Sequence, residues 1–155
     1  MKTIPPVVRS VQVRIAPHEA FALFTADMRL WWPFVGHSCG DADAVDVQFE
    51  PRAGGAVTEI GKDGQRWPWG TLAEWDPPHG FAMSWHPGLD AALATRLRVR
   101  FVAQPDGGTE VQVHHDGWEA RGAQAAAKRD QYDGGWPVTL AAFADAAAQR
   151  ERTSR

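Results

Sequence analysis

Short segments in which apolar and polar residues alternate occupy most of the chain between residues 44 and 115. A period of two is typical of half-buried strands. With one similar segment near the N-terminus, the alternation predicts strands over residues 7–15, 45–50, 56–60, 67–75, 81–85, 95–103 and 109–115. Runs rich in Gly, Pro and Asp at 51–55, 62–64, 76–80 and 105–108 predict tight turns. The middle of the chain is therefore predicted to form an antiparallel meander.

Helical patterns flank this meander. A helix is predicted to have Pro17 in its first turn, because apolar residues at positions 20, 21, 23 and 24 fall on one helical stripe. Residues 27–32 predict a second short helix that Pro33 ends, and residues 34–43 predict a loop. Residues 119–150 are rich in helix formers and predict a closing helix. The pair Gly134 and Gly135 leaves open whether this helix kinks or ends there.

The order of these elements predicts an α+β fold of the helix-grip type. In this architecture a curved antiparallel sheet of about six or seven strands wraps around a long C-terminal helix, and two short helices follow the first strand. Because the chain has 155 residues and no long polar linker, we expect one domain over residues 1–155.

The composition narrows the range of functions. Hydrophobic residues make up 44% of the chain, and no apolar run approaches the roughly 20 residues that a membrane span requires. The first ten residues lack the apolar stretch of a secretory signal, and the single cysteine, Cys39, has no partner for an internal disulfide. We therefore expect a cytoplasmic protein. A net charge of −3 without a basic stripe argues against nucleic acid as a partner.

Eight tryptophans are an unusual number for a chain of this length. Each is a large, rigid, mostly apolar body with one N–H to satisfy, so these side chains share one core or line one ligand cavity. Both interpretations stay open for Trp31, Trp32, Trp69, Trp85, Trp118 and Trp136. Trp67 and Trp75 are assigned instead to an outer strand face or to a contact in a homodimer.

Side-chain parity indicates which strand residues would face a cavity. Alternate positions of a strand point to the same side of the sheet, and we expect the apolar sets to point inward. The inward sets are Val57 and Glu59; Phe81, Met83 and Trp85; Leu97, Val99 and Phe101; and Val111, Val113 and His115. His114, Arg96, Arg98 and Arg100 then form a solvated outer face, on which an anionic partner could also dock.

An interior carboxylate and an interior imidazole, Glu59 and His115, allow two interpretations. If they met across the cavity, burial and pairing would shift their pKa values, and either could act as a general acid or base. The favoured alternative is structural: His115 bonds a backbone carbonyl, and Glu59 accepts from a Trp N–H or lies at a wet cavity mouth. Tyr132, one helical turn before Trp136, either bonds a ligand or lies on the helix surface.

One loop is crowded with side chains of the kind that bind metals. These are His37, Cys39, Asp41 and Asp43, but their spacing matches no standard metal motif. The sequence also lacks a phosphate-binding glycine loop and a nucleophile elbow. We therefore predict no metal and no cofactor.

Taken in order, the motifs of the chain resemble a known family. They are PHEAFALFT at 17–25, WWP at 31–33, FEPRAGG at 49–55, WG at 69–70, DPP at 76–78 leading to Trp85, VRF at 99–101, HDGW at 115–118 and GGW at 134–136. This series resembles the SRPBCC (START/Bet v1-like) superfamily, and within it the activator of Hsp90 ATPase homologue 1-like family. The resemblance implies a cavity between the sheet and the C-terminal helix, which in this superfamily holds lipids, polyketides, hormones and other apolar molecules. It does not imply one activity.

Three functions from different classes are consistent with these features. The first is binding of a small apolar or aromatic molecule in a Trp-lined cavity. The second is an enzyme of the cyclase, dehydratase or hydrolase kind that uses Glu59 and His115 as acid and base. The third is an interaction module for a partner protein, related to stress or chaperones as the family name suggests, in which an exposed strand and the outer tryptophans matter more than the cavity. We prefer them in that order.

Overall fold

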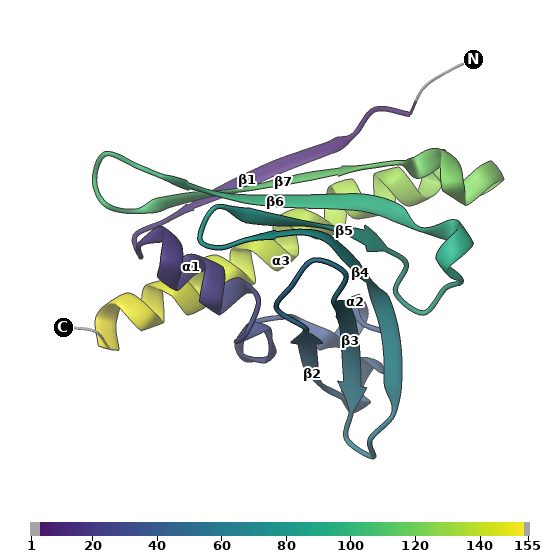
Figure 1. The fold of residues 1–155 in the computed structure, drawn as a ribbon, viewed down its shortest axis with the longest axis horizontal. Coiled ribbons are helices and arrows are strands. Elements are labelled where there is room, and N and C mark those ends of the chain that lie inside the picture. The colour runs from purple at the N-terminus through teal and green to yellow at the C-terminus, as the bar shows by residue number, and fades with distance from the viewer. Residues whose placement is uncertain (1–3, 154–155) are drawn as a thin grey trace.

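The computed structural model describes residues 4–153 and contains one curved sheet of seven antiparallel strands, as the sequence predicts. The spatial order of the strands is β1-β7-β6-β5-β4-β3-β2. Their bounds are β1 (Val7–Val13), β2 (Ala44–Phe49), β3 (Ala56–Gly61), β4 (Arg66–Asp76), β5 (Gly80–Trp85), β6 (Thr95–Ala103) and β7 (Thr109–Asp116). Figure 1 shows the long helix α3 (Ala125–Thr153) lying along the sheet, so the fold is the helix-grip fold.

Shorter helices connect these elements. After β1 come α1 (Pro17–Phe24), the 3₁₀ helix η1 (Met28–Leu30), α2 (Phe34–His37) and the 3₁₀ turn η2 (Asp41–Asp43); η3 (Ala91–Leu93) precedes β6, and η4 (Trp118–Gln124) precedes α3. The predicted loop at 34–43 therefore contains two short helical turns. Within α2, Gly36 has a φ of 85°, a left-handed conformation that glycine adopts without a steric penalty.

The inner face of the sheet follows the predicted alternation. In the register of β6 and β7, Leu97 pairs with His115 and Val99 pairs with Val113, and all four side chains are buried. On the opposite face Arg96 pairs with Asp116 at 2.9 Å. Burial of the apolar set and solvation of the charged set fix this register, since a slip by one residue would exchange the two faces.

Strand β4 departs from simple alternation, and the observed pairing partners of two of its tryptophans correct their outer-face assignment. The pairing of β4 shifts register on both sides, between Val57/Thr58 of β3 and again opposite β5. Trp67 pairs directly with Glu59 and so shares its inner face, where its ring lies against Gly40. Trp75 packs on Phe21 of α1 with ring centroids 4.9 Å apart. Both rings are half-buried within the chain rather than placed on the outer face.

Helix α3 runs without interruption through Gly134 and Gly135, which settles the question that the sequence left open. Its buried side chains recur at helical spacing, at Trp136, Leu140, Phe143 and Ala147. This apolar stripe packs on the concave side of the molecule, where the rings of Phe143 and Phe24 lie 5.3 Å apart. Tertiary packing thus maintains a helix that two glycines would weaken in isolation.

Within residues 4–153, the helices are too short or too polar to cross a membrane.

Candidate functional site

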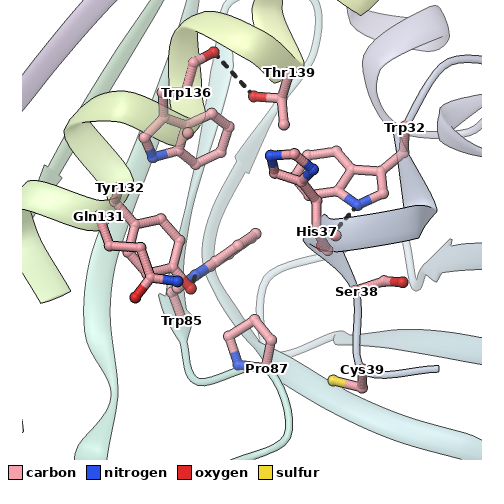
Figure 2. Close-up of a pocket in the computed structure, with 12 residues that line it drawn as sticks. Trp32, His37, Ser38, Cys39, Trp85, Pro87, Gln131, Tyr132, Trp136 and Thr139 are labelled. Carbon is pink, nitrogen blue, oxygen red and sulfur yellow. Dashed lines mark hydrogen bonds between the residues drawn. The ribbon is translucent and has the colours of Figure 1, made fainter. Parts of the chain in front are cut away.

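A pocket of about 380 Å³ opens between the N-terminal half of α3, the α2 turn and the end of β5. Its lining consists of Trp32, Gly36, His37, Ser38, Cys39, Trp85, Pro87, Gln131, Tyr132, Gly135, Trp136 and Thr139. Figure 2 shows the α3 side chains on one wall and His37, Ser38 and Cys39 on the facing wall. The volume falls in the range of small-molecule sites, roughly 300–1,000 Å³.

Aromatic rings form most of the apolar wall. The ring centroids of Trp32 and Trp136 are 6.2 Å apart, and those of Trp85 and Trp136 are 5.8 Å apart. Tyr132 lies beside them and accepts a hydrogen bond from Trp85 Nε1 at 3.0 Å (Figure 2). Helix α3 presents Tyr132, Trp136 and Thr139 on one face because these positions are four and three residues apart.

The polar groups behind the aromatic wall are already paired. Burial raises the pKa of the Tyr132 hydroxyl, although the hydrogen bond from Trp85 opposes this effect. The indole N–H of Trp32 donates to the carbonyl oxygen of His37 at 3.1 Å. The hydroxyl of Thr139 donates to the carbonyl of Trp136 at 3.0 Å (Figure 2). These bonds hold the pocket-forming side chains in one arrangement before any ligand enters.

His115 lies behind this wall and is fully buried. Its Nδ1 accepts a hydrogen bond from Trp136 Nε1 at 3.0 Å, and its Nε2 lies 2.7 Å from Thr95 Oγ1. Because an indole N–H only donates, Nδ1 carries no hydrogen and the proton is on Nε2. The hydroxyl of Thr95 then accepts from Nε2 and donates to the carbonyl of Trp85 at 3.2 Å. The chain of hydrogen bonds fixes the tautomer of His115 and the orientation of Trp136.

The environment of His115 keeps its imidazole neutral. Burial lowers its pKa to about 3, and the charge of Arg121 acts in the same direction. A group with this pKa carries no proton to donate as an imidazolium near pH 7. The geometry therefore agrees with a structural role, in which His115 accepts from a Trp N–H rather than bonding the backbone carbonyl that we expected.

Glu59 is also fully buried, and three N–H groups surround its carboxylate. Oε1 accepts from Trp69 Nε1 at 2.8 Å and from the backbone N–H of Cys39 at 2.8 Å, and Oε2 accepts from the N–H of Gly40 at 2.6 Å. The carboxylate thus joins β3 and β4 to the segment that follows α2. Because that segment forms one wall of the pocket, Glu59 positions the wall without lining the cavity.

Glu59 and His115 have separate sets of partners, and in the described chain no hydrogen bond joins them. The sequence left open whether they meet as an acid–base pair. In the structure each is held by neighbours that satisfy its hydrogen-bonding atoms, and neither contributes to the pocket lining.

The residues named from the sequence for the cavity divide into two groups. Trp32, Trp85, Tyr132 and Trp136 line the pocket. The others fill the closed core beneath it: Trp31, Val57, Glu59, Trp69, Phe81, Met83, Leu97, Val99, Phe101, Val111, Val113, His115 and Trp118. Their rings and methyl groups pack against one another, so the space between sheet and helix is largely occupied by side chains.

Several lining residues were not assigned to the cavity from the sequence. His37 and Cys39 were noted only as members of a crowded loop, Gly135 only as a possible break in the helix, and Gln131 and Thr139 were not singled out. The helical spacing of the last three with Tyr132 and Trp136 is a signal that a helical-wheel argument would have found. The position of the loop carried no such signal, because the anchor at Glu59 lies about 20 residues away in the sequence.

Cys39 contributes a protonated thiol to the pocket. Burial, together with the nearby negative charge of Glu59, raises the pKa of this thiol to about 12. A thiol in this state is a weak nucleophile at neutral pH. Among residues 4–153, no cluster of three or more His, Cys, Asp or Glu side chains is arranged to hold a metal ion.

Solved structures with the same fold cover nearly the whole chain. An anthrahydroquino-gamma-pyrone synthase, Txn09, complexed with SUM is 35% identical with a TM-score of 0.65, and the match covers 94% of this chain and 99% of that one. The self-sacrificing resistance protein CalC from Micromonospora echinospora is 28% identical with a TM-score of 0.65, covering 94% and 96% of the two chains.

More distant structures agree in fold alone. The Aha1 dimer from Colwellia psychrerythraea is 13% identical with a TM-score of 0.64, over 93% of this chain and 96% of that chain. Comparison with curated proteins gives no match. The model of the family described as activator of Hsp90 ATPase homolog 1-like protein matches residues 14–148. The chain therefore belongs to the activator of Hsp90 ATPase homologue 1-like family, as its motifs indicated.

Proposed function

We propose that this protein binds a planar, polycyclic aromatic molecule in the pocket between α2, β5 and α3. The observation that carries the proposal is the pocket wall itself, in which the indole rings of Trp32, Trp85 and Trp136 surround a volume of about 380 Å³. Rigid aromatic walls favour flat apolar ligands, which they contact over a large area at a small cost in side-chain entropy.

The position of the polar groups supports binding rather than a closed core. The pocket combines the aromatic wall with His37, Ser38 and Gln131, which can orient a ligand at its edge. The similarity to an anthrahydroquino-gamma-pyrone synthase supports the same class of ligand.

The similarity to the synthase favours a second candidate function, the formation of a pyrone ring on a bound aromatic molecule. If such a reaction occurs here, its acid or base is a group that faces the pocket. His37 meets that requirement, whereas Glu59 and His115 are enclosed in the core. In the enzymatic alternative, His37 of α2 therefore replaces Glu59 and His115 as the candidate acid or base.

A pair of adjacent glycines provides the test of binding. Gly135 lines the pocket, Gly134 is exposed, and a side chain at either position meets no atom within 4 Å at its Cβ. Gly135→Phe would place a ring in the cavity, whereas Gly134→Phe makes the same chemical change on the outside of α3. The probe is fluorene, a flat hydrocarbon of three fused rings, titrated by isothermal calorimetry and by quenching of tryptophan fluorescence.

We expect the wild type and Gly134→Phe to bind fluorene with a Kd on the order of 10 µM, given typical ligand efficiencies. Gly135→Phe should weaken binding at least tenfold because its side chain occupies the same space. If Gly134→Phe and Gly135→Phe bind fluorene with the same Kd, or if the wild type does not bind fluorene, the pocket is not the ligand site and the proposal is wrong.

A further inference from the structure

One buried polar atom stands out among residues 4–153. His37 Nδ1 is the single buried side-chain nitrogen or oxygen without a hydrogen-bond partner in this part of the chain. Buried polar groups are nearly always paired, so an exception calls for an explanation. The residue that carries it lines the pocket, and its imidazole extends between Trp32 and the α3 wall (Figure 2).

The unpaired nitrogen determines where the ring carries its hydrogen. An N–H at Nδ1 would be a buried donor without an acceptor, which is the more costly of the two alternatives. The neutral ring therefore carries its hydrogen on Nε2, at the outer edge of the imidazole, which faces the side of the cavity formed by Trp136 and Thr139 (Figure 2). If the ring takes a second proton, Nε2 still carries a hydrogen. In both states His37 offers an N–H donor to the pocket.

The backbone that carries this donor is held in place on both sides of His37. The carbonyl of His37 accepts from Trp32 Nε1 at 3.1 Å. The preceding residue, Gly36, donates its N–H to Asp41 Oδ1 at 2.7 Å, and the following backbone is anchored on Glu59. An N–H group fixed at the edge of an aromatic slot is preorganised to recognise an oxygen atom of a ligand.

We propose that His37 Nε2 donates a hydrogen bond to a carbonyl oxygen on the ring system of the ligand, so that the pocket selects aromatic ketones, quinones or pyrones over aromatic hydrocarbons. This inference rests on the proposed function, because it concerns the same pocket. Thr139 and Ser38 do not replace His37 in this role, since their hydroxyl groups donate to the backbone carbonyls of Trp136 and Phe34. In this proposal His37 supplies the preference for a ligand that carries a carbonyl group.

The test compares 9-fluorenone with fluorene, which share one flat skeleton and differ by a carbonyl group. Affinities for both probes are measured by calorimetry in the wild type, His37→Leu and His37→Gln. We expect the wild type to prefer fluorenone by roughly three- to tenfold, as one net hydrogen bond allows. His37→Leu should lose this preference while it retains its affinity for fluorene. His37→Gln, which keeps an N–H donor, should restore part of the preference.

The outcomes separate this inference from the proposed function. If both probes bind equally to the wild type, or if His37→Leu keeps the preference for fluorenone, His37 does not recognise the carbonyl and the inference is wrong, although the pocket remains a binding site. If neither probe binds and Gly135→Phe changes nothing, the proposed function itself is wrong. A thermal melt of each variant establishes that the comparison is made on folded protein.

Discussion

The indole N–H of Trp136 donates to Nδ1 of His115 across 3.0 Å, and this bond connects the pocket wall to the sheet. Trp136 belongs to α3 and His115 to β7, so the bond joins the helix to the strand that it covers. On its far side His115 is held by Thr95 of β6. The Trp136 ring therefore lines the pocket, while its indole nitrogen is held by the hydrogen bond to the buried His115.

Removal of His115 should reveal the strength of this connection. His115→Phe leaves the Trp136 N–H buried without an acceptor, and we expect a loss of about 1–3 kcal/mol in the free energy of unfolding. His114→Phe is the matched control, because His114 is exposed on the opposite face of the same strand, and it should change stability by less than about 0.5 kcal/mol.

A double-mutant cycle with Trp136→Phe completes this first prediction. When both residues are Phe, no unpaired N–H remains, so the double variant should lose less stability than the sum of the two single losses. The coupling should reach about 1 kcal/mol or more in urea unfolding at neutral pH. Simple additivity would show that the bond contributes nothing to the fold.

The neutral state of His115 predicts how stability depends on pH. Its pKa is lowered from 6.5 to about 3 by burial, so between these values the unfolded chain binds a proton that the folded chain does not. The contribution of this group is therefore fully present above pH 6.5 and is lost as the pH falls toward 3, at up to about 1.4 kcal/mol per pH unit.

The measurement compares the free energy of unfolding of the wild type and His115→Gln between pH 7.5 and 5, where carboxylates contribute little. The slope of the free energy of unfolding against pH reports how many protons the chain binds on unfolding. In the lower half of this range, we expect His115→Gln to bind nearly one proton fewer than the wild type. Equal slopes would mean that His115 is protonated as readily in the folded state as in the unfolded chain.

Part of the fold was predictable because it depends on local patterns. The alternation in β6 and β7 placed Val99, Phe101 and Val113 on the inner face, where the structure buries them. The bulged strand β4 shows the limit of this argument. Trp67 and Trp75 pair with the inner-face residues Glu59 and Phe81, and between the two register shifts Leu72 also faces inward although its position has the opposite parity. Parity can be read from sequence only as long as the ladder stays regular.

The candidate site was less predictable because its geometry depends on long-range bonds. The sequence shows a carboxylate at Glu59 and an amide at Gly40, but nothing in their spacing indicates that one caps the other. The same holds for Trp136 and His115, which belong to different elements. From the sequence, Gly135 was interpreted as a point where the helix kinks or ends. In the structure the helix continues through Gly135, and this residue lines the pocket.

Glu59 should be intolerant even of a change that keeps its shape. In Glu59→Gln one oxygen becomes an NH₂ group, which must face an N–H donor of Trp69, Cys39 or Gly40. We expect a loss of roughly 2–3 kcal/mol in stability, as for a buried hydrogen bond to a charged group. Hydrogen exchange should accelerate most at residues 36–40, because the carboxylate anchors that segment.

The control for this third prediction is Glu74→Gln. Glu74 lies on the outer face and bonds Arg98 in solvent, so its loss should change stability little and leave exchange at 36–40 unchanged. If Glu59→Gln matched this control in both measurements, the carboxylate would not be the anchor of the pocket wall.

The thiol of Cys39 should report on the charge of Glu59. Burial and the nearby carboxylate raise its pKa to about 12, so little thiolate is present at pH 8. Alkylation by iodoacetamide should therefore be slower than that of a free cysteine by roughly ten- to a hundredfold, since the higher nucleophilicity of a high-pKa thiolate offsets part of its scarcity. Glu59→Gln should accelerate the reaction because the repulsive charge is gone.

Bound fluorene should slow alkylation in the wild type and not in Gly135→Phe, because Cys39 and Gly135 line the same pocket. A rate that is indifferent to fluorene would place Cys39 outside the volume that the ligand occupies.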